Sequence, residues 1–239
     1  MGRVLVFAVL FALAPSAQAD PARVPVVVEL FTSEGCSSCP PADAVLSRLA
    51  REQPVAGAQI IPLGMHVTYW DQLGWKDPAS LGDATARQQG YGRIFGEDRV
   101  YTPQAVVDGR DELVGSDGAG LMRTIARAAQ RPHAAVALSA RLEGDAIVAH
   151  ADVTGVPPEV KESLQTLFLL TEDGLASTVT RGENGGRTLH HDAVVRRMSS
   201  AARFASIPAG WQRDRLHVVA LVQEARSRRI VGAASVPIS

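Results

Sequence analysis

Cysteine, lysine and long apolar stretches are scarce in this sequence. Cys36 and Cys39 are the only cysteines among 239 residues, which excludes a scaffold of several disulfides and a zinc site made of four cysteines. Lys76 and Lys161 are the only lysines, and the formal net charge is −1, so the chain lacks a basic footprint for nucleic acid or an anionic membrane. Beyond the first residues, no apolar run approaches the roughly 20 residues that span a bilayer. We therefore expect no nucleic-acid partner and no membrane span in the mature chain.

The first 19 residues have the pattern of a secretory signal peptide. Arg3 precedes an apolar run over residues 4–14, and the segment ends in Ala17-Gln18-Ala19, a small-x-small cleavage motif. We predict cleavage after Ala19 and export of residues 20–239 to a bacterial periplasm, a compartment in which disulfides persist.

The two cysteines lie between an expected strand and an expected helix. Residues 26–31 are apolar apart from Glu29, which is typical of a strand buried on both faces. Residues 40–51 carry apolar residues at helical spacing, and Pro40 suits the first turn because the amide hydrogen it lacks would be unpaired there. A thiol at a helix N-terminus faces free amides and the positive end of the helix dipole, which favour the thiolate. This setting predicts a redox-active dithiol with Cys36 and Cys39 as catalytic residues.

Residues next to the cysteines are expected to tune the thiolate in opposite directions. Ser37 and Ser38 lie between the cysteines and can donate hydrogen bonds to a thiolate, whereas the carboxylate of Glu34 would raise the thiol pKa. The net sign stays open, so the sequence does not choose between an oxidase, a reductase and an isomerase.

Three other interpretations of the cysteine pair stay open. A structural disulfide across so short a loop would stabilise the fold by roughly 2 kcal/mol, against about 4 to 5 kcal/mol for a long loop. In a copper-binding protein or metallochaperone, Cys36, Cys39 and His66 would be the ligands, because Cu(I) prefers soft thiolates. A non-catalytic envelope interaction module would keep only the fold.

A second expected strand brings further side chains to the cysteines. Residues 60–67 form an apolar run, although Pro62 weakens the pattern because proline cannot donate to a strand ladder. In a β-α-β unit the carboxyl ends of parallel strands share one edge of the sheet. Four residues are therefore expected beside the dithiol: His66 and Asp71 to tune it, and Tyr69 and Trp70 to form a substrate-binding lip.

A hairpin and two helices complete this half of the chain. Asp108-Gly109 between two short apolar stretches is a strong hairpin signal, and Thr102-Pro103 just before it is a candidate cis-proline turn. Residues 83–95 and 118–131 are expected helices, the second one capped by Asp117.

The order strand, CxxC, helix, strand, helix, X-Pro, hairpin and helix resembles the thioredoxin fold. The resemblance implies a cis bond before Pro103 that lies against the dithiol. It also implies that Cys36 is the exposed attacking thiol and Cys39 the resolving one, and that Thr102 and Pro103 offer backbone groups to a substrate.

Four motifs carry a narrower resemblance. The segments ELFTSEGCSSCPPAD, HVTYWDQLGWKDP, YTPQAVVDG and RGENGG are similar to an uncharacterised exported thioredoxin-like family of bacteria, known as a domain of unknown function. The similarity covers most of the mature chain. That family's pattern has an acidic residue where Thr68 stands, and no proline at Pro62.

From about residue 133 the pattern changes to short alternating strands, expected over 136–142, 147–153, 164–170, 216–222 and 230–236. We predict a signal peptide over 1–19, a thioredoxin-like α/β domain over 20–132, and a small antiparallel all-β, sandwich-like domain over 133–239.

The loop Arg181–Arg187 is interpreted as a glycine-rich turn, an anion site or a lip that reaches the dithiol. His190 and His191 are expected on opposite faces of a strand.

The resulting hypothesis is an exported thiol-disulfide oxidoreductase that needs no cofactor besides its own redox-active disulfide. The Cys36 thiolate would attack a substrate disulfide, and Cys39 would resolve the mixed disulfide. The partners would be protein or peptide thiols and disulfides, together with a redox protein that recycles the dithiol.

Overall fold

The computed structural model describes residues 23–97 and 99–238 as an α/β protein with one large mixed sheet. This sheet has eight strands in the order β13-β12-β7-β10-β2-β1-β3-β4, and two smaller sheets have the orders β11-β6-β5 and β8-β9. The predicted signal peptide, residues 1–19, lies outside the described residues.

The helices are α1 (Pro40–Glu52), α2 (Gly82–Phe95) and α3 (Gly118–Ala128), with a short 3-10 helix at Arg213–Arg215. The strands of the first half are β1 (Val24–Thr32), β2 (Ala58–His66), β3 (Gln104–Val107) and β4 (Asp111–Val114). Those of the second half are β5 (Ala135–Glu143), β6 (Ala146–Thr154), β7 (Leu164–Glu172), β8 (Leu175–Thr178), β9 (Thr188–His191), β10 (Val194–Ser199), β11 (Arg203–Phe204), β12 (Leu216–Glu224) and β13 (Ile230–Pro237).

The elements expected in the first half are present. β1 and β2 run parallel along their whole length, and β3 and β4 form the expected hairpin. Pro40 occupies the first turn of α1, and the Asp117 side chain caps α3 by accepting a hydrogen bond from the N–H of Gly120. The Thr102–Pro103 peptide bond is cis. These local predictions are confirmed.

Both faces of β1 are buried, as its continuous apolar pattern predicts. Its even-numbered apolar residues pack with α1 and α3 on one face, and its odd-numbered ones pack with α2 and with strands of the second half on the other. Glu29 points to the second of these faces because side chains alternate along a strand. There its carboxylate pairs with the buried guanidinium of Arg87 from α2 and accepts a hydrogen bond from the hydroxyl of Tyr91. The one charged residue in the run is therefore compensated inside the core.

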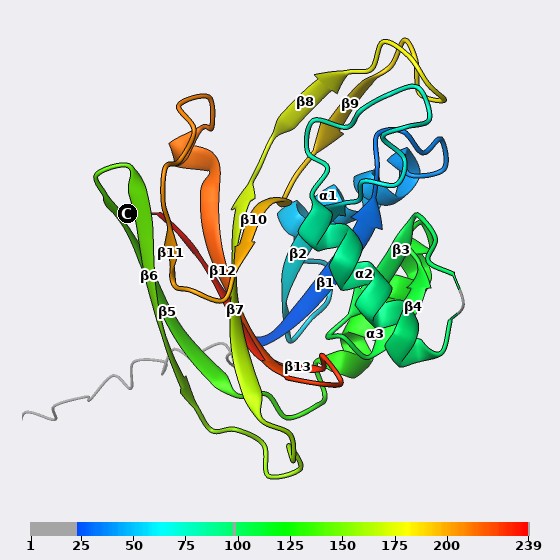
Figure 1. Ribbon diagram of the computed structural model, residues 1–239. Coiled ribbons are helices and arrows are strands. Elements are labelled where there is room, and N and C mark those ends of the chain that lie inside the picture. Colours follow the sequence, from blue (N-terminus) through cyan, green and yellow to red (C-terminus); the bar gives the residue numbers. More distant parts are fainter. Residues whose placement is uncertain (1–22, 98, 239) are drawn as a thin grey trace, which may run out of the picture.

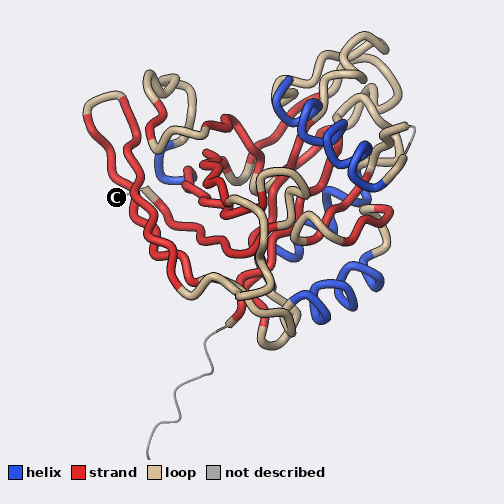
Figure 2. The backbone as a smooth tube through the Cα atoms, turned by 60° about the horizontal axis from the view of Figure 1, so that its bottom comes forward, coloured by secondary structure: helices blue, strands red, loops and turns tan. Residues whose placement is uncertain are grey.

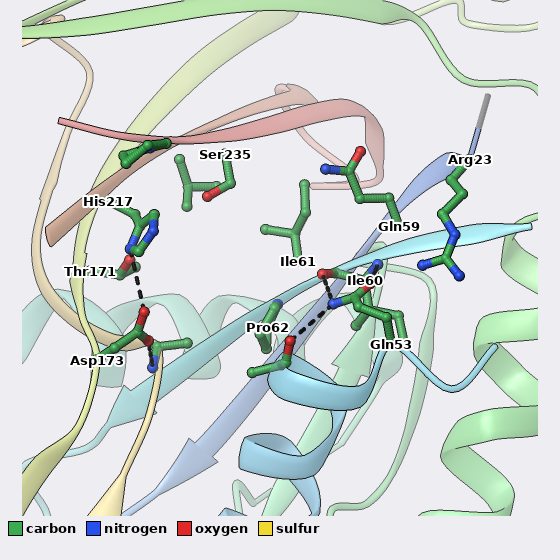
Figure 3. A pocket seen from close by; sticks show the side chains of 14 residues that line it. Arg23, Gln53, Gln59, Ile60, Ile61, Pro62, Thr171, Asp173, His217 and Ser235 are labelled. Carbon is green, nitrogen blue, oxygen red and sulfur yellow. Dashed lines mark hydrogen bonds and ion pairs between the residues drawn. The ribbon is translucent and has the colours of Figure 1, made fainter. Parts of the chain in front are cut away.

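Pro62 fits into β2 because the outer edge of that strand is almost unpaired. β2 pairs fully with β1, but with β10 only where Gly64 lies opposite Val194. Pro62 is two residues before Gly64 and faces the same edge, so no ladder bond is lost there. At Ile60 the side chain of Gln53 replaces a neighbouring strand: it accepts from the Ile60 N–H at 2.7 Å and donates to the Ile60 carbonyl at 3.0 Å (Figure 3). Pro62 and Gln53 thus protect the edge from further pairing.

The boundary expected near residue 132 does not divide the sheet. β1 to β4 lie before it and β7, β10, β12 and β13 after it, yet all belong to the same eight-stranded sheet. One hydrophobic cluster contains residues from both halves, such as Met65 and Leu221. The expected antiparallel strands of the second half are found, but several of them extend the sheet of the first half. The reason is that β7 and β12 carry apolar residues on both faces, which pack into two separate hydrophobic clusters.

The other face of β7 and β12 is covered by the three-stranded sheet. A third cluster joins Ile147 of β6 with Phe168 of β7 and Val218 of β12, which gives this region two packed layers of sheet. In Figure 2 the three long helices gather at one end of the molecule, and strands and loops build the other.

Residues 174–193, named the arm below, leave the large sheet as the two-stranded sheet β8-β9. β8 follows β7, β9 leads into β10, and the arm extends over the end of the molecule where α1 begins (Figure 1). Gly174 and Ala193 at its base have positive φ angles of 65° and 54°. Two reciprocal hydrogen bonds link this base, from Gly174 N to Asp192 Oδ1 at 3.1 Å and from Ala193 N to Asp173 Oδ1 at 2.7 Å. The strand expected around His190 and His191 is β9, whereas β8 was not among the predicted elements.

Candidate redox site

Cys36 and Cys39 form a disulfide at the N-terminus of α1. Both residues are 0% exposed, while Ser37 and Ser38 between them are exposed. The exposed Cys36 that the thioredoxin resemblance implies is therefore not found. The reason is close packing around the dithiol loop: a Cβ on Gly35 would lie 3.1 Å from the Cβ of Trp70.

The turn before the hairpin lies against Cys36. The carbonyl oxygen of Thr102 is 4.0 Å from Cys36 Sγ, and the hydroxyl of Ser38 is 3.3 Å from the same sulfur. The Thr102 hydroxyl accepts a hydrogen bond of 2.8 Å from Trp70 Nε1. The carbonyl of Pro103 is already engaged, because it accepts a hydrogen bond from the N–H of Gly115. The structure thus brings together the turn and one of the two expected lip residues beside Cys36.

Five titratable side chains of the same region are buried, each at most 6% exposed. They come from the β1–α1 loop, α1, β2, the loop after β2, and β9 of the arm. Sequence reasoning identified two of them as tuning residues and missed the other three, because their elements meet only in the folded chain. The five are Glu34, Asp43, His66, Asp77 and His191.

His66 and Asp77 form a buried pair, with 2.7 Å between His66 Nδ1 and Asp77 Oδ2. Burial disfavours the charged imidazole, but the adjacent carboxylate and its hydrogen bond outweigh burial and raise the pKa of His66. Burial would raise the pKa of Asp77, but the charge and hydrogen bond of His66 lower it instead. The same Asp77 oxygen accepts the backbone N–H of Glu34 at 2.9 Å, so this pair also shapes the loop that leads to Cys36.

His191 of the arm lies between two carboxylates. Its Nε2 is 3.4 Å from Glu34 Oε1, and its Nδ1 is 3.7 Å from Asp43 Oδ2. His191 Nε2 and Asp43 Oδ2 have no hydrogen-bond partner among the described residues. Burial raises the pKa of Asp43, although the nearby imidazoles of His191 and His66 oppose the shift. The sequence correctly predicts that His191 and His190 face opposite sides, since His191 is buried and His190 exposed, but it gives no signal for the position beside the dithiol.

Glu34 is held by donors from two sides. Its Oε2 accepts hydrogen bonds from Trp75 Nε1 at 2.8 Å and from the hydroxyl of Ser177 at 3.0 Å. Trp75 belongs to the loop after β2 and Ser177 to the arm. Glu34 therefore lies in the loop before Cys36, as expected, and it is also bonded to the loop after β2 and to the arm.

The loop Arg181–Arg187 forms the tip of the arm and reaches the dithiol, which agrees with the lip among its interpretations. The buried Asn184 side chain donates both amide hydrogens, at 2.9 Å each, to the carbonyls of Glu34 and Cys36. The Glu183 carboxylate accepts the N–H of Ser37 at 2.9 Å. Residues of the second half thus complete the site.

The remaining predicted residues belong to the loop after β2. Tyr69 is 37% exposed, its hydroxyl donates to Gln88 Oε1 at 3.1 Å, and burial of the ring raises its pKa. Asp71 accepts the N–H of Asp77 and the hydroxyl of Ser80, so its hydrogen bonds shape the loop. Thr68 bonds to Thr85 of α2 through both its backbone N–H and its hydroxyl, so this position ties the loop to α2.

A cleft of about 690 Å³ lies elsewhere, between the outer edge of β2 and strands β12 and β13. Figure 3 shows Ile61 and Pro62 along it, with the ion pair of His217 and Asp173 at one end and Arg23 at the other. Neither cysteine lines this cleft.

Within residues 23–97 and 99–238, no group of three or more His, Cys, Asp and Glu side chains is arranged to hold a metal ion. None of the helices in the described part of the chain is both long and apolar enough to span a membrane.

Fold and site together define an α/β protein with a Cys-x-x-Cys disulfide at a helix N-terminus, covered by an arm from its second half. A family model described as protein of unknown function (DUF1223) matches residues 27–231. The chain belongs to this family, which confirms the resemblance of the motifs to a domain of unknown function.

Two solved structures resemble this chain over most of its length. A protein from Agrobacterium tumefaciens, solved by a structural genomics consortium, is 28% identical, with a TM-score of 0.65 over 90% of this chain and 94% of the other. The protein HBP35 of Porphyromonas gingivalis is 13% identical, with a TM-score of 0.65 over 90% of this chain and 76% of the other. The second likeness shows a shared fold alone. No curated protein matches the chain.

Proposed function

We propose that this protein is an exported thiol-disulfide oxidoreductase of thioredoxin-like type. The observation that carries the proposal is the Cys36–Cys39 disulfide at the N-terminus of α1, with the Thr102–Pro103 turn beside it. A helix N-terminus favours the thiolate at Cys36 once the disulfide is reduced. Export rests on the signal-peptide pattern of residues 1–19.

In the reducing direction, the Cys36 thiolate attacks one sulfur of a substrate disulfide. A Cys36–substrate bond forms, the substrate disulfide breaks, and the released sulfur leaves as a thiolate that takes a proton. The Cys39 thiolate then attacks Cys36 Sγ and releases the second substrate sulfur. The substrate gains two electrons and two protons, and the protein is left with its disulfide. The oxidising direction is the reverse sequence.

The buried titratable groups support this cycle because the resolving step needs a proton acceptor away from bulk water. Asp43 lies one turn after Cys39 on α1, and residues four apart on a helix are neighbours. Its pKa is raised by burial, which makes it a better proton acceptor than an exposed carboxylate. We assign Asp43 the role of proton acceptor for Cys39, with His191 connecting it to Glu34.

The reduction potential of the Cys36–Cys39 pair tests the proposal. Metal-free mature protein would be equilibrated in glutathione buffers, and its free thiols trapped and counted. A reversible potential between about −120 and −270 mV is expected for a working oxidoreductase. A pair that stays oxidised well below about −300 mV would be an inert structural disulfide and would overturn the proposal.

Copper binding is the rival proposal, favoured by the orientation of His66. Because its Nδ1 bonds to Asp77, only Nε2 is left for a metal, as in many metal-binding histidines. Reduced protein would be titrated with Cu(I) against a competing chelator. One tightly bound Cu(I), lost in both Cys36→Ser and Cys39→Ser, would favour the metallochaperone.

If neither disulfide exchange nor Cu(I) binding is found, the remaining alternative is an envelope interaction module. Its binding to a partner should tolerate Cys36→Ser.

A further inference from the structure

Glu183 places a carboxylate on the peptide that joins the two cysteines. Its Oε2 accepts the N–H of Ser37 at 2.9 Å, across 146 positions of sequence. Hydrogen bonds from the Ser37 hydroxyl and N–H lower the pKa of Glu183, so the group is ionised at neutral pH. No ion pair between Glu183 and a cationic side chain is found in the described part of the chain.

The arm fixes this carboxylate in place. The adjacent Asn184 is buried and holds the carbonyls of Glu34 and Cys36. On the other side, Gly182 has a positive φ of 77° and lies so close to the loop after β2 that a Cβ would be 3.2 Å from the Cβ of Trp75. The backbone on both sides of Glu183 is therefore packed, and its charge stays near Ser37.

A charge in this position works against the helix N-terminus. The positive end of the α1 dipole stabilises a thiolate at Cys36. The Glu183 carboxylate occupies the amide directly after Cys36 and adds a negative charge beside it, and a like charge disfavours ionisation of the thiol.

The other charged groups near the dithiol are already compensated or buried. Asp77 is paired with His66, and His191 faces both Glu34 and Asp43. Glu34 also has neutral donors from Trp75 and Ser177. Glu183 is thus the solvent-facing acid that bonds directly to the dithiol loop.

We propose that Glu183 is a tuning residue of the dithiol: from the arm, it makes Cys36 a poorer thiolate and keeps the Cys36–Cys39 pair more reducing. The inference rests on the proposed function and adds that the second half of the chain sets the redox poise of the first. It also explains why the arm reaches across the molecule to this loop.

The first test uses Glu183→Gln in a Cys39→Ser background, where Cys36 is the one thiol left. Glutamine keeps the acceptor oxygen and the size of the side chain but removes the charge. The rate of alkylation by iodoacetamide would be followed against pH. We expect the midpoint to move to lower pH, with a roughly threefold larger thiolate fraction below the midpoint. In the intact dithiol, at a pH above the midpoint where Cys36 is a thiolate in the reduced protein, the reduction potential should rise by about 14 mV, which is the same threefold change converted for two electrons.

The matched control is Glu159→Gln, which removes an equal charge from an exposed position in the β6–β7 connection, at the opposite end of the molecule from the arm tip (Figure 1). Glu159→Gln should leave midpoint and potential unchanged. Glu183→Ala adds a second readout, because a merely structural role would shift the midpoint in Glu183→Ala but not in Glu183→Gln.

The two proposals fail in different ways. If the wild-type pair exchanges reversibly but Glu183→Gln behaves like Glu159→Gln, the tuning role of Glu183 is overturned and the oxidoreductase stands. If the wild-type potential lies well below about −300 mV, the oxidoreductase is overturned whatever the alkylation midpoint does.

Discussion

His191 and His66 meet edge to face, with their ring centroids 4.8 Å apart. One histidine comes from β2 and the other from the arm, so this contact joins the two halves of the chain at the candidate site. Because both rings face carboxylates, the contact also joins the His66–Asp77 pair to Glu34 and Asp43.

Replacing His191 by phenylalanine should destabilise the fold. The ring shape is kept, but Glu34 and Asp43 lose the imidazole between them, and a buried polar group without its partner costs about 1–3 kcal/mol. Urea unfolding of the oxidised protein measures the loss. His190→Phe, one position earlier on the exposed face, is the control and should change stability by less than about 0.5 kcal/mol. Equal stabilities of the two variants would show that His191 has no electrostatic role.

The His66–Asp77 pair should make stability depend on pH in two windows. The pKa of Asp77 is lowered, so its stabilisation is present above the ordinary value near 3.8 and is lost as pH falls through the lowered pKa. The pKa of His66 is raised, so its stabilisation is complete below about 6.5 and is lost as pH rises through the raised pKa. The pair contributes most between these two limits.

Asp77→Asn tests this dependence. Removing one partner of a buried ion pair costs about 3 kcal/mol, and the difference from wild type should be largest near pH 5 to 6 and shrink at higher pH, as His66 becomes neutral. Urea unfolding between pH 4 and pH 8 measures it. Asp71→Asn, in the same loop but bonded to Asp77 N–H and Ser80, should show no such window. A difference that does not vary with pH would contradict the assignment.

Local signals in the sequence were enough for the elements around the dithiol. The apolar run ending at Phe31, Pro40 after the cysteines, and Asp108-Gly109 each act through nearby backbone, so strand, helix start and hairpin follow from them. Parallel pairing of β1 and β2 then places His66 near the loop of Cys36. All of these contacts form within a single β-α-β unit and its neighbouring hairpin, so local patterns are enough to predict them.

The rest of the site depends on contacts between distant parts of the chain. His191, Glu183 and Asn184 reach the dithiol because β7 and β10 join the first sheet and carry the arm over it. No local pattern encodes such a crossing; the composition of the Arg181–Arg187 loop allowed a lip that reaches the dithiol, but equally an anion site or a glycine-rich turn. The change to alternating strands near residue 133 suggested a separate domain, since alternation reports half-buried strands but not which sheet they join.

Gln53→Ala should weaken the link between α1 and β2. It leaves the N–H and carbonyl of Ile60 without the side chain that pairs with them, at a cost of about 1–3 kcal/mol. The uncovered edge of β2 is also a template for pairing with another chain. We expect a lower urea midpoint and more dimer in light scattering at high concentration. Gln59→Ala, which alters a neighbouring residue of the same cleft, is the control, and the same behaviour in both variants would argue against edge protection by Gln53.

Asn184→Ala should loosen the dithiol loop without touching a sulfur. The variant removes both donors to the carbonyls of Glu34 and Cys36, so we expect a loss of about 1–3 kcal/mol in urea unfolding. Because the tip of the arm then keeps the Glu183 bond to Ser37 but loses both bonds to the carbonyls, the buried disulfide should be reduced several-fold faster by dithiothreitol in stopped-flow measurements. Arg187→Ala removes only the contact on the far side of Asn184 and should leave the reduction rate near that of wild type. If Asn184→Ala is reduced no faster than Arg187→Ala, the arm does not control access to Cys36, and the cover must come from Trp70 and the Thr102 turn.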